Sequence, residues 1–198
     1  MNFLKGLFVV LTVVLLSGTA AAADKAIVIY FSHAGENNGV GYVQEGNTAK
    51  VAKTIARRLN ADIYEIKEAR PYSPKFEACV VQAKEEQRRN ARPAIAGQLP
   101  DLSSYKVIFI GYPIWFGDCP MIIYSFLEKE NLNGKIIVPF CTHEGSGLGK
   151  TAQNLQRHFP RAKVVQKGLA IKGTIAQRDP KMTAKAVEMW LKALKIVK

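Results

Sequence analysis

Short apolar runs alternate with longer amphipathic stretches along the chain, and this alternation limits the possible folds more than any other feature of the sequence. The apolar runs cover residues 26–31, 62–66, 106–111, 135–141 and 164–171. Each is too short for an ordinary helix, and stretches typical of helices follow them at residues 49–59, 76–90, 119–133, 148–159 and 180–198. Such an alternation predicts an α/β protein with a doubly wound, five-stranded parallel sheet and helices on both faces.

The first 23 residues have the layout of a cleavable export signal. Lys5 precedes the apolar run 7–16, and small residues follow up to Ala23. The alternative is a retained membrane anchor, but a spanning helix needs roughly 20 apolar residues. We therefore expect a mature domain of residues 24–198, exported to the periplasm or secreted, with no stable membrane span after cleavage of the signal.

The charge of the chain is strongly positive, with 28 Lys and Arg against 16 Asp and Glu and a formal net charge of +12. Such a surface favours acidic partners or an anionic membrane surface. Nucleic acid is a less favoured partner, because the basic residues are scattered along the predicted helices without interleaved aromatic residues. The three cysteines, Cys79, Cys119 and Cys141, have no spacing that indicates a disulfide framework or a metal site, so we expect buried thiols.

In a doubly wound sheet, ligands bind beyond the carboxyl ends of the strands, which draws attention to three loops. The first loop begins after the strand at 26–31, makes a glycine-containing excursion over residues 36–45 and ends where a helix opens. Hydroxyl, amide and backbone N–H donors at a helix N-terminus suit a phosphate, although ordinary helix capping is the alternative. The candidate ligand residues here are Ser32, His33, Gly46, Asn47 and Thr48.

The second loop places two large aromatic residues in the polar turn region after a buried strand. Exposed aromatic rings favour a flat ligand or a protein partner, with Trp115 as the stacking residue. In the alternative, the rings fold back over the apolar edge of the domain itself. The candidates are Pro113, Ile114, Trp115, Phe116 and Gly117.

The third loop is rich in glycine and polar residues, so its backbone can approach the edge of a planar ring. Its candidates are Thr142, His143, Glu144, Gly145, Ser146 and Gly147. Glu144 stands where a triphosphate-binding loop would need its first glycine, which argues against a nucleotide triphosphatase. Ser146 lacks the GxSxG frame of many serine hydrolases, so neither of these enzyme classes is indicated.

In chain order, the three loops read SxxG with a helix opening GNT, then GYPIWFG, then PFCTHEGSG. This set of motifs resembles the flavodoxin family, particularly its bacterial branch with long first loops. The resemblance covers the whole mature chain. It implies strand order 2-1-3-4-5 and FMN at the point where the strand order reverses. It also implies that Ser32, Asn47 and Thr48 hold the phosphate, while residues 113–117 and 142–147 line the flavin ring.

Three features depart from the usual family pattern: the excursion at 36–45, the positive charge and the export signal. The resemblance implies electron transfer, with the flavin carrying the chemistry and no catalytic side chain, and the export signal indicates that it takes place outside the cytoplasm. The partner would be an acidic redox protein or a small electron acceptor. Two alternatives remain, an FMN-dependent quinone or nitro-compound reductase and a flavin-binding module without redox activity.

Overall fold

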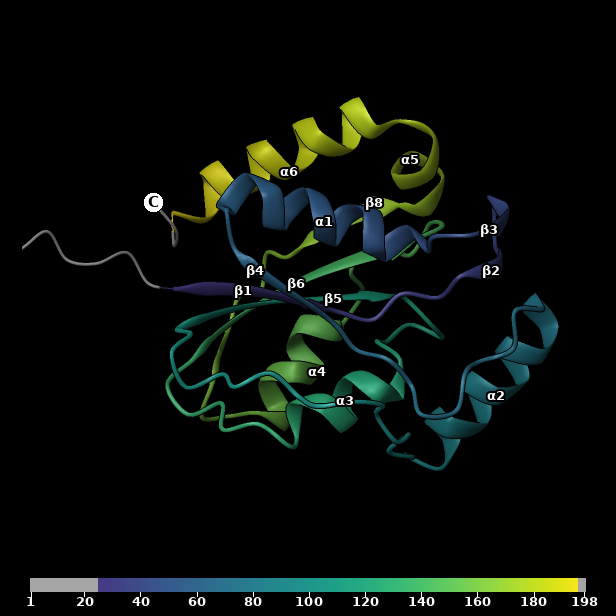
Figure 1. The fold of residues 1–198 in the computed structure, drawn as a ribbon, viewed down its shortest axis with the longest axis horizontal. Coiled ribbons are helices and arrows are strands. Elements are labelled where there is room, and N and C mark those ends of the chain that lie inside the picture. Colours follow the sequence, from purple (N-terminus) through teal and green to yellow (C-terminus); the bar gives the residue numbers. More distant parts are fainter. Residues whose placement is uncertain (1–24, 196–198) are drawn as a thin grey trace, which may run out of the picture.

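The computed structural model describes residues 25–195, so the predicted export signal lies outside the described residues. A parallel sheet forms the centre of the molecule (Figure 1). Its strands are β1 (Ala26–Tyr30), β4 (Asp62–Glu65), β5 (Val107–Pro113), β6 (Ile136–His143), β7 (Lys163–Val164) and β8 (Leu169–Lys172). The spatial order is β4-β1-β5-β6, with both β7 and β8 pairing with β6. This confirms the predicted flavodoxin-like order 2-1-3-4-5.

The fifth position of the sheet differs from the single strand expected over residues 164–171. Two short strands share it: β7 pairs with Ile136 and Ile137, and β8 pairs with β6 further along. The gap between them lies beside Pro139, which has no N–H to donate to a ladder. Gly168 packs directly on this proline, because a Cβ atom there would stand 2.4 Å from the Pro139 carbonyl oxygen.

The helices cover both faces of the sheet (Figure 1). On one face lie α1 (Asn47–Leu59), α5 (Gly173–Arg178) and α6 (Pro180–Leu194), and on the other lie α3 (Met121–Leu127) and α4 (Thr151–His158). The sequence did not indicate α5, a helix of 6 residues directly after β8. No helix in the described part of the chain is long and apolar enough to cross a membrane.

Alternating side chains of the strands build one apolar core under each helical layer. Ile27, Ile29 and Phe31 join the core beneath α3 and α4, whereas Val28 and Tyr30 join the core beneath α1 and α6. All five side chains are buried. Each large apolar side chain buried in this way contributes about 1.5–3 kcal/mol, so the sheet and its two helical layers form a rigid support for the loops at its carboxyl end.

The excursion at 36–45, expected as a loop, forms part of a small antiparallel hairpin. Its strands are β2 (Gly35–Asn37) and β3 (Gly41–Val43). Gly39 in the turn and Gly41 at the start of β3 have positive φ angles of 73° and 80°, which glycine adopts without a steric penalty. Asn37 stabilises the base of the hairpin because its Nδ2 donates to the carbonyl oxygens of His33 and Gly35. The hairpin stands over the carboxyl ends of the central strands (Figure 1).

The helix α2 (Phe76–Arg88) is placed differently from the other predicted helices, because it lies beyond the carboxyl ends of the strands (Figure 1). It is carried on an excursion from the sheet that an antiparallel bridge between Glu68 and Ile95 closes. Two backbone hydrogen bonds of 2.8 Å flank this bridge, from Ala69 N to Ala94 O and from Ala96 N to Lys67 O. The helix therefore lies where it can form one wall of the space beyond the strand ends, and it does not cover the sheet.

Candidate functional site

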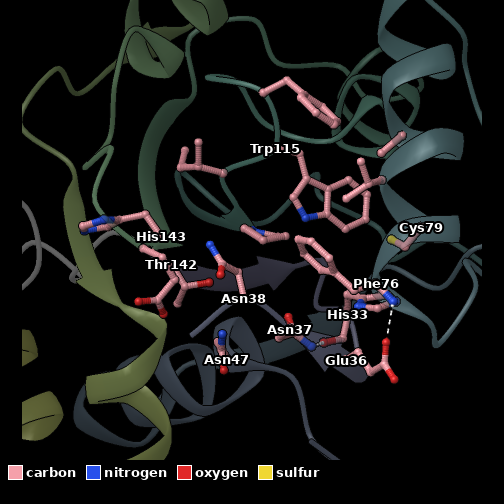
Figure 2. Close-up of a pocket in the computed structure, with 16 residues that line it drawn as sticks. His33, Glu36, Asn37, Asn38, Asn47, Phe76, Cys79, Trp115, Thr142 and His143 are labelled. Carbon is pink, nitrogen blue, oxygen red and sulfur yellow. Dashed lines mark hydrogen bonds between the residues drawn. The ribbon is translucent and has the colours of Figure 1, made fainter. Parts of the chain in front are cut away.

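A cavity of about 200 Å³ lies at the carboxyl ends of β1, β5 and β6, where the three loops meet α2 (Figure 2). It is the region in which ligands bind in doubly wound folds. We call it the carboxyl-end cavity. The residues that line it are His33, Glu36, Asn37, Asn38, Asn47, Phe76, Cys79, Val80, Ala83, Pro113, Ile114, Trp115, Phe116, Thr142, His143 and Glu144.

Ser32 caps α1 from outside that helix. Its Oγ accepts a hydrogen bond of 3.0 Å from Ala49 N, in the first turn of α1. Gly46 makes this close approach possible, because a Cβ atom there would stand 2.3 Å from Ser32 Oγ and 2.4 Å from the His33 carbonyl oxygen. The side-chain cap that the alternative interpretation expected from Asn47 or Thr48 is thus supplied by Ser32. Ser32 and Gly46 do not line the cavity.

Asn47 provides the best evidence for a polar ligand at this helix N-terminus. Its Oδ1 atom is buried and has no hydrogen-bond partner, although its side chain lines the cavity. Within the described residues, the backbone N–H groups of Asn47 and Thr48 also have no acceptor. A buried acceptor calls for a donor such as a hydroxyl group, and free N–H groups at a helix start suit an anion. The ribityl hydroxyls and the phosphate of FMN supply both, so the residues present fit this group.

Thr48 connects the first loop with the third. Its Oγ1 lies 2.8 Å from Thr142 Oγ1, and both side chains are buried. Thr142 lines the cavity, but Thr48 does not. A hydroxyl pair of this kind holds the start of α1 against the end of β6, so its first role in the structure is to fix the relative position of two loops.

The second loop folds into a tight turn from Trp115 to Asp118. The two residues exchange backbone hydrogen bonds of 2.9 and 3.1 Å around Phe116 and Gly117, whose φ angles are 49° and 79°. Two consecutive positive φ angles are typical of a type I′ turn. Phe116 is unusual in this conformation, since a side chain with Cβ disfavours the left-handed region, and such outliers often occur at binding sites.

The two aromatic rings of this turn point in different directions. Trp115 packs edge-on against Phe31, Tyr72 and His33, with ring centroids 5.6, 5.1 and 6.0 Å apart, and it also lines the cavity. Phe116 is 47% exposed. Trp115 therefore has features of both alternatives considered for this loop. It covers the apolar edge of its own domain, and part of its surface lines the cavity, where a ligand could contact it.

Asp118 holds this turn in place, and the sequence analysis did not identify it. Its Oδ1 accepts from Cys119 N at 2.8 Å. Its Oδ2 accepts from Tyr124 Oη at 3.1 Å and from Asn154 Nδ2 at 2.7 Å. Three donors, from Cys119, α3 and α4, thus converge on one carboxylate, which anchors the turn to the helices beneath it. Its only sequence signal is an acidic residue directly after a glycine turn, which is too common to indicate this role.

The third loop has fewer restraints. Glu144 Oε1 accepts from Thr174 N at the start of α5, at 2.9 Å, and His143 Nδ1 accepts from Gly145 N at 2.9 Å. A Cβ atom at Gly145 or Gly147 would meet nothing within 4 Å. These two glycines and Ser146 lie outside the cavity, and the two glycines face open space, as does Gly117.

The histidines of the site have defined hydrogen bonds. His33 is buried, and its Nε2 lies 3.0 Å from the Ser73 carbonyl oxygen, so that nitrogen carries the proton and donates. His143 accepts at Nδ1, which requires the neutral ring with its proton on Nε2. Burial lowers the pKa of His143 below 6.5, and Lys172 lowers it further, while Glu144 raises it. His143 is thus held as a neutral hydrogen-bond acceptor near neutral pH.

One side of α2 faces the cavity, a contribution that the sequence analysis missed. Phe76, Cys79, Val80 and Ala83 line the cavity and recur at the i, i+3, i+4 and i+7 positions of one helical face. This stripe was visible in the sequence, but the ordinary expectation for such a stripe is contact with the sheet. Burial raises the pKa of the Cys79 thiol to about 11, so this group stays protonated.

The remaining thiols, Cys119 and Cys141, are buried and free, as expected. Within the described residues no group of three or more metal-ligating side chains comes together. Nine of the candidate residues from the sequence line the cavity, from all three loops: His33, Asn47, Pro113, Ile114, Trp115, Phe116, Thr142, His143 and Glu144. The structure thus gathers the three loops at one place.

Comparisons with known proteins agree with this architecture. The chain resembles a flavoprotein from Bacteroides eggerthii, with 30% identity over 86% of this chain and 97% of that one and a TM-score of 0.67. A flavoprotein from Bacteroides uniformis gives 29% identity over 86% and 99%, with a TM-score of 0.68. A flavoprotein from Lactobacillus acidophilus, solved in complex with FMN, is similar in fold, with 22% identity over 77% and 95% and a TM-score of 0.60.

No curated protein matches the sequence. The family model described as flavodoxin matches residues 25–187, which is almost the whole of the described domain. This match, together with the 30% identity to the Bacteroides eggerthii flavoprotein, confirms the family that the loop motifs predicted. The chain belongs to the flavodoxin family.

Proposed function

We propose that this protein is an FMN-binding flavoprotein that transfers electrons outside the cytoplasm. The observation that carries the proposal is the buried, unpartnered Asn47 Oδ1 beside free N–H groups at the start of α1. Membership of the flavodoxin family and the FMN complex of the Lactobacillus acidophilus flavoprotein support FMN as the ligand. The flavin would supply one- and two-electron chemistry, and the protein would supply binding and orientation.

Different residues of this chain would bind different parts of FMN. Asn47 and the N–H groups of the first turn of α1 would bind the polar chain and the phosphate. The turn from Trp115 to Asp118 and residues 142–147 would border the ring. Ser32 and Thr48, which the resemblance placed at the phosphate, would support this region through their hydrogen bonds to Ala49 N and Thr142 Oγ1.

The proposal is tested first by titrating the purified mature domain with FMN and following the flavin fluorescence. Saturable binding of one FMN per chain is expected, and no binding would refute the proposal. Trp115→Ala should weaken FMN binding by about 1 kcal/mol, roughly fivefold, because a large aromatic surface beside the ligand is lost. Trp190→Phe is the matched control, because Trp190 packs on Phe109 beneath α6, away from the cavity.

Export and the redox partner are the parts of the proposal that rest on the sequence. The mature N-terminus should lie near Asp24, which mass spectrometry of protein isolated from the cell envelope would measure. The positive net charge supports an acidic redox protein as the partner. Electron transfer to such a partner should slow as salt is added, because surface charges are screened over about 10 Å at 0.1 M.

A flavin-binding module without redox activity is distinguished by the flavin itself. An electron-transfer protein bleaches on reduction and regains its absorbance on reoxidation, whereas an inert module would bind FMN without reversible bleaching.

A further inference from the structure

The basic residues of the protein gather on one of its two helical layers, the layer of α1, α5 and α6 (Figure 1). These three helices carry eight Lys and Arg side chains against one carboxylate, Glu188. The helices α2, α3 and α4 carry three basic side chains against three acidic ones. We call the outer side of the first layer the basic face. Its eight residues are Lys50, Lys53, Arg57, Arg58, Arg178, Lys181, Lys185 and Lys192.

The charge of the basic face is only partly compensated within the protein. Lys53 pairs with Glu45, and both Arg58 and Lys192 pair with Glu188. Within the described residues, the other five basic side chains of this face form no ion pair: Lys50, Arg57, Arg178, Lys181 and Lys185. Like charges gathered on one surface repel each other, so a partner that brings negative charge would relieve this repulsion.

Two large apolar side chains stand exposed among these lysines. Met182 is 50% exposed and Met189 is 63% exposed. They lie two turns apart on one side of α6, and Lys185 lies between them at the i+3 position. A lipid surface suits this combination, because its headgroups attract the lysines while its acyl chains accept the methionines.

A nucleic acid fits the basic face less well. Single strands bind through aromatic side chains on which the bases stack. The one aromatic residue of α1, α5 and α6 is Trp190, whose ring packs on Phe109 and whose Nε1 donates to the Lys167 carbonyl oxygen at 3.1 Å. The ring is thus engaged within the domain.

The basic face is also separate from the carboxyl-end cavity. None of its eight residues lines that cavity. The helices α1 and α6 pack against each other, with an ion pair of 3.5 Å between Arg58 and Glu188, and each is about 20 Å long. A partner can therefore cover two adjacent helices without occupying the proposed flavin site.

We propose that the basic face binds the surface of a membrane that contains anionic lipids. The lysines and arginines contact the lipid phosphates, and Met182 and Met189 insert between the headgroups. This interaction goes beyond the proposed flavin function, since it holds the protein at a membrane surface and leaves the carboxyl-end cavity open to a redox partner.

The first test measures sedimentation of the chain from Asp24 onward, which contains all of the described fold, with lipid vesicles. Vesicles of phosphatidylcholine with phosphatidylglycerol should bind the protein at least about tenfold more tightly than vesicles of phosphatidylcholine alone, because each cation near an anionic surface contributes about fivefold. Added salt should weaken the binding. Equal binding to the two kinds of vesicle, or binding to neither, would overturn the proposal.

Two double variants with the same loss of charge locate the surface. Lys181→Gln with Lys185→Gln should weaken vesicle binding by about 25-fold, at about fivefold for each lysine. Lys84→Gln with Lys129→Gln removes two exposed lysines from α2 and from the segment after α3, and it should change binding by less than about threefold. Equal losses in the two double variants would show that the whole protein is attracted without a docking face.

A tryptophan reporter tests whether the methionines enter the lipid. In Met189→Trp the fluorescence emission should shift to shorter wavelength when anionic vesicles are added, because the indole ring leaves water. Val81→Trp, at a position 69% exposed on α2, is the matched control and should show no added shift. The same spectrum in both variants would contradict insertion through α6.

Other anionic partners are tested on the same proteins with polyglutamate and duplex DNA. Binding to either polymer without binding to vesicles would overturn the membrane and reassign the basic face to that class of partner. FMN titration is the control for folding and for the cavity. The wild type and the variant with Lys181→Gln and Lys185→Gln should bind FMN equally, so the loss of vesicle binding and a failure of the proposed function are measured separately.

Discussion

The two loops on either side of the proposed flavin position differ in how firmly the protein holds them. The turn from Trp115 to Asp118 is closed by two backbone hydrogen bonds, and the Asp118 carboxylate accepts three more. Residues 143–147 depend chiefly on the bonds from Thr174 N to Glu144 and from Gly145 N to His143, and their glycines face open space.

This difference indicates separate roles for the two loops. A turn fixed by several part-buried hydrogen bonds can keep strained residues such as Phe116 in position before any ligand arrives. A glycine-rich segment with few restraints can adjust its backbone to the ligand that it meets. One side of the site is thus organised in advance, and the other side adapts.

The largest effect is expected from Asp118→Ala. The substitution leaves donors from Cys119, Tyr124 and Asn154 without their acceptor, which should cost about 2 kcal/mol of unfolding free energy. For a chain of this size, Tm should fall by roughly 4–8 °C. Calorimetric melting measures this.

Asp101→Ala is the matched control for that variant, because Asp101 accepts from Ser103 in an exposed turn. It should cost less than about 1 kcal/mol. If both aspartates cost the same, the turn from Trp115 to Asp118 is not specially anchored, and the contrast between the two loops fails.

A smaller effect should separate Gly117→Ala from Gly147→Ala. Both glycines lie in the left-handed region, with φ of 79° and 62°, and an added Cβ would meet nothing within 4 Å at either position, so the two substitutions compare backbone strain. In the anchored turn the strain cannot be relieved, so Gly117→Ala should cost about 1 kcal/mol. Residues 143–147 can shift, so Gly147→Ala should cost less. Urea unfolding compares the two, and the reverse order would show that the third loop is the more rigid.

The smallest effect concerns pH. Burial lowers the pKa of His143 below its ordinary value of 6.5, so the unfolded chain binds the proton more tightly than the folded one. The contribution of neutral His143 is therefore complete above pH 6.5 and is lost as the pH falls below it. Because His143 Nδ1 accepts from Gly145 N, the protection of the Gly145 amide against exchange, relative to the intrinsic rate at each pH, should fall on acidification, with no such change at Asp118 N in the anchored turn.

His143→Gln removes the titrating group and should abolish this pH dependence. If the variant keeps it, another group controls the third loop.

The sequence by itself determined the alternation of strands and helices and, through its resemblance to the flavodoxin family, the order of the strands. Buried runs such as residues 106–111 and 135–141 are typical of interior parallel strands, and the carboxyl ends of such strands meet at one edge, where the candidate site was expected. Local patterns therefore identified the flavodoxin family and nine of the residues that line the cavity.

Only the tertiary structure decided which way side chains point and which helix closes the site. Trp115 could face solvent, a ligand or its own core, and contacts with Phe31 and Tyr72, distant in the sequence, select its orientation. The apolar stripe of α2 has the same sequence pattern whether the helix packs on a sheet or lines a cavity. The bridge between Glu68 and Ile95 directs α2 to the cavity, together with the hydrogen bonds that join His33 and Glu36 to residues 73–76. Such long-range pairings have no local signature in the chain.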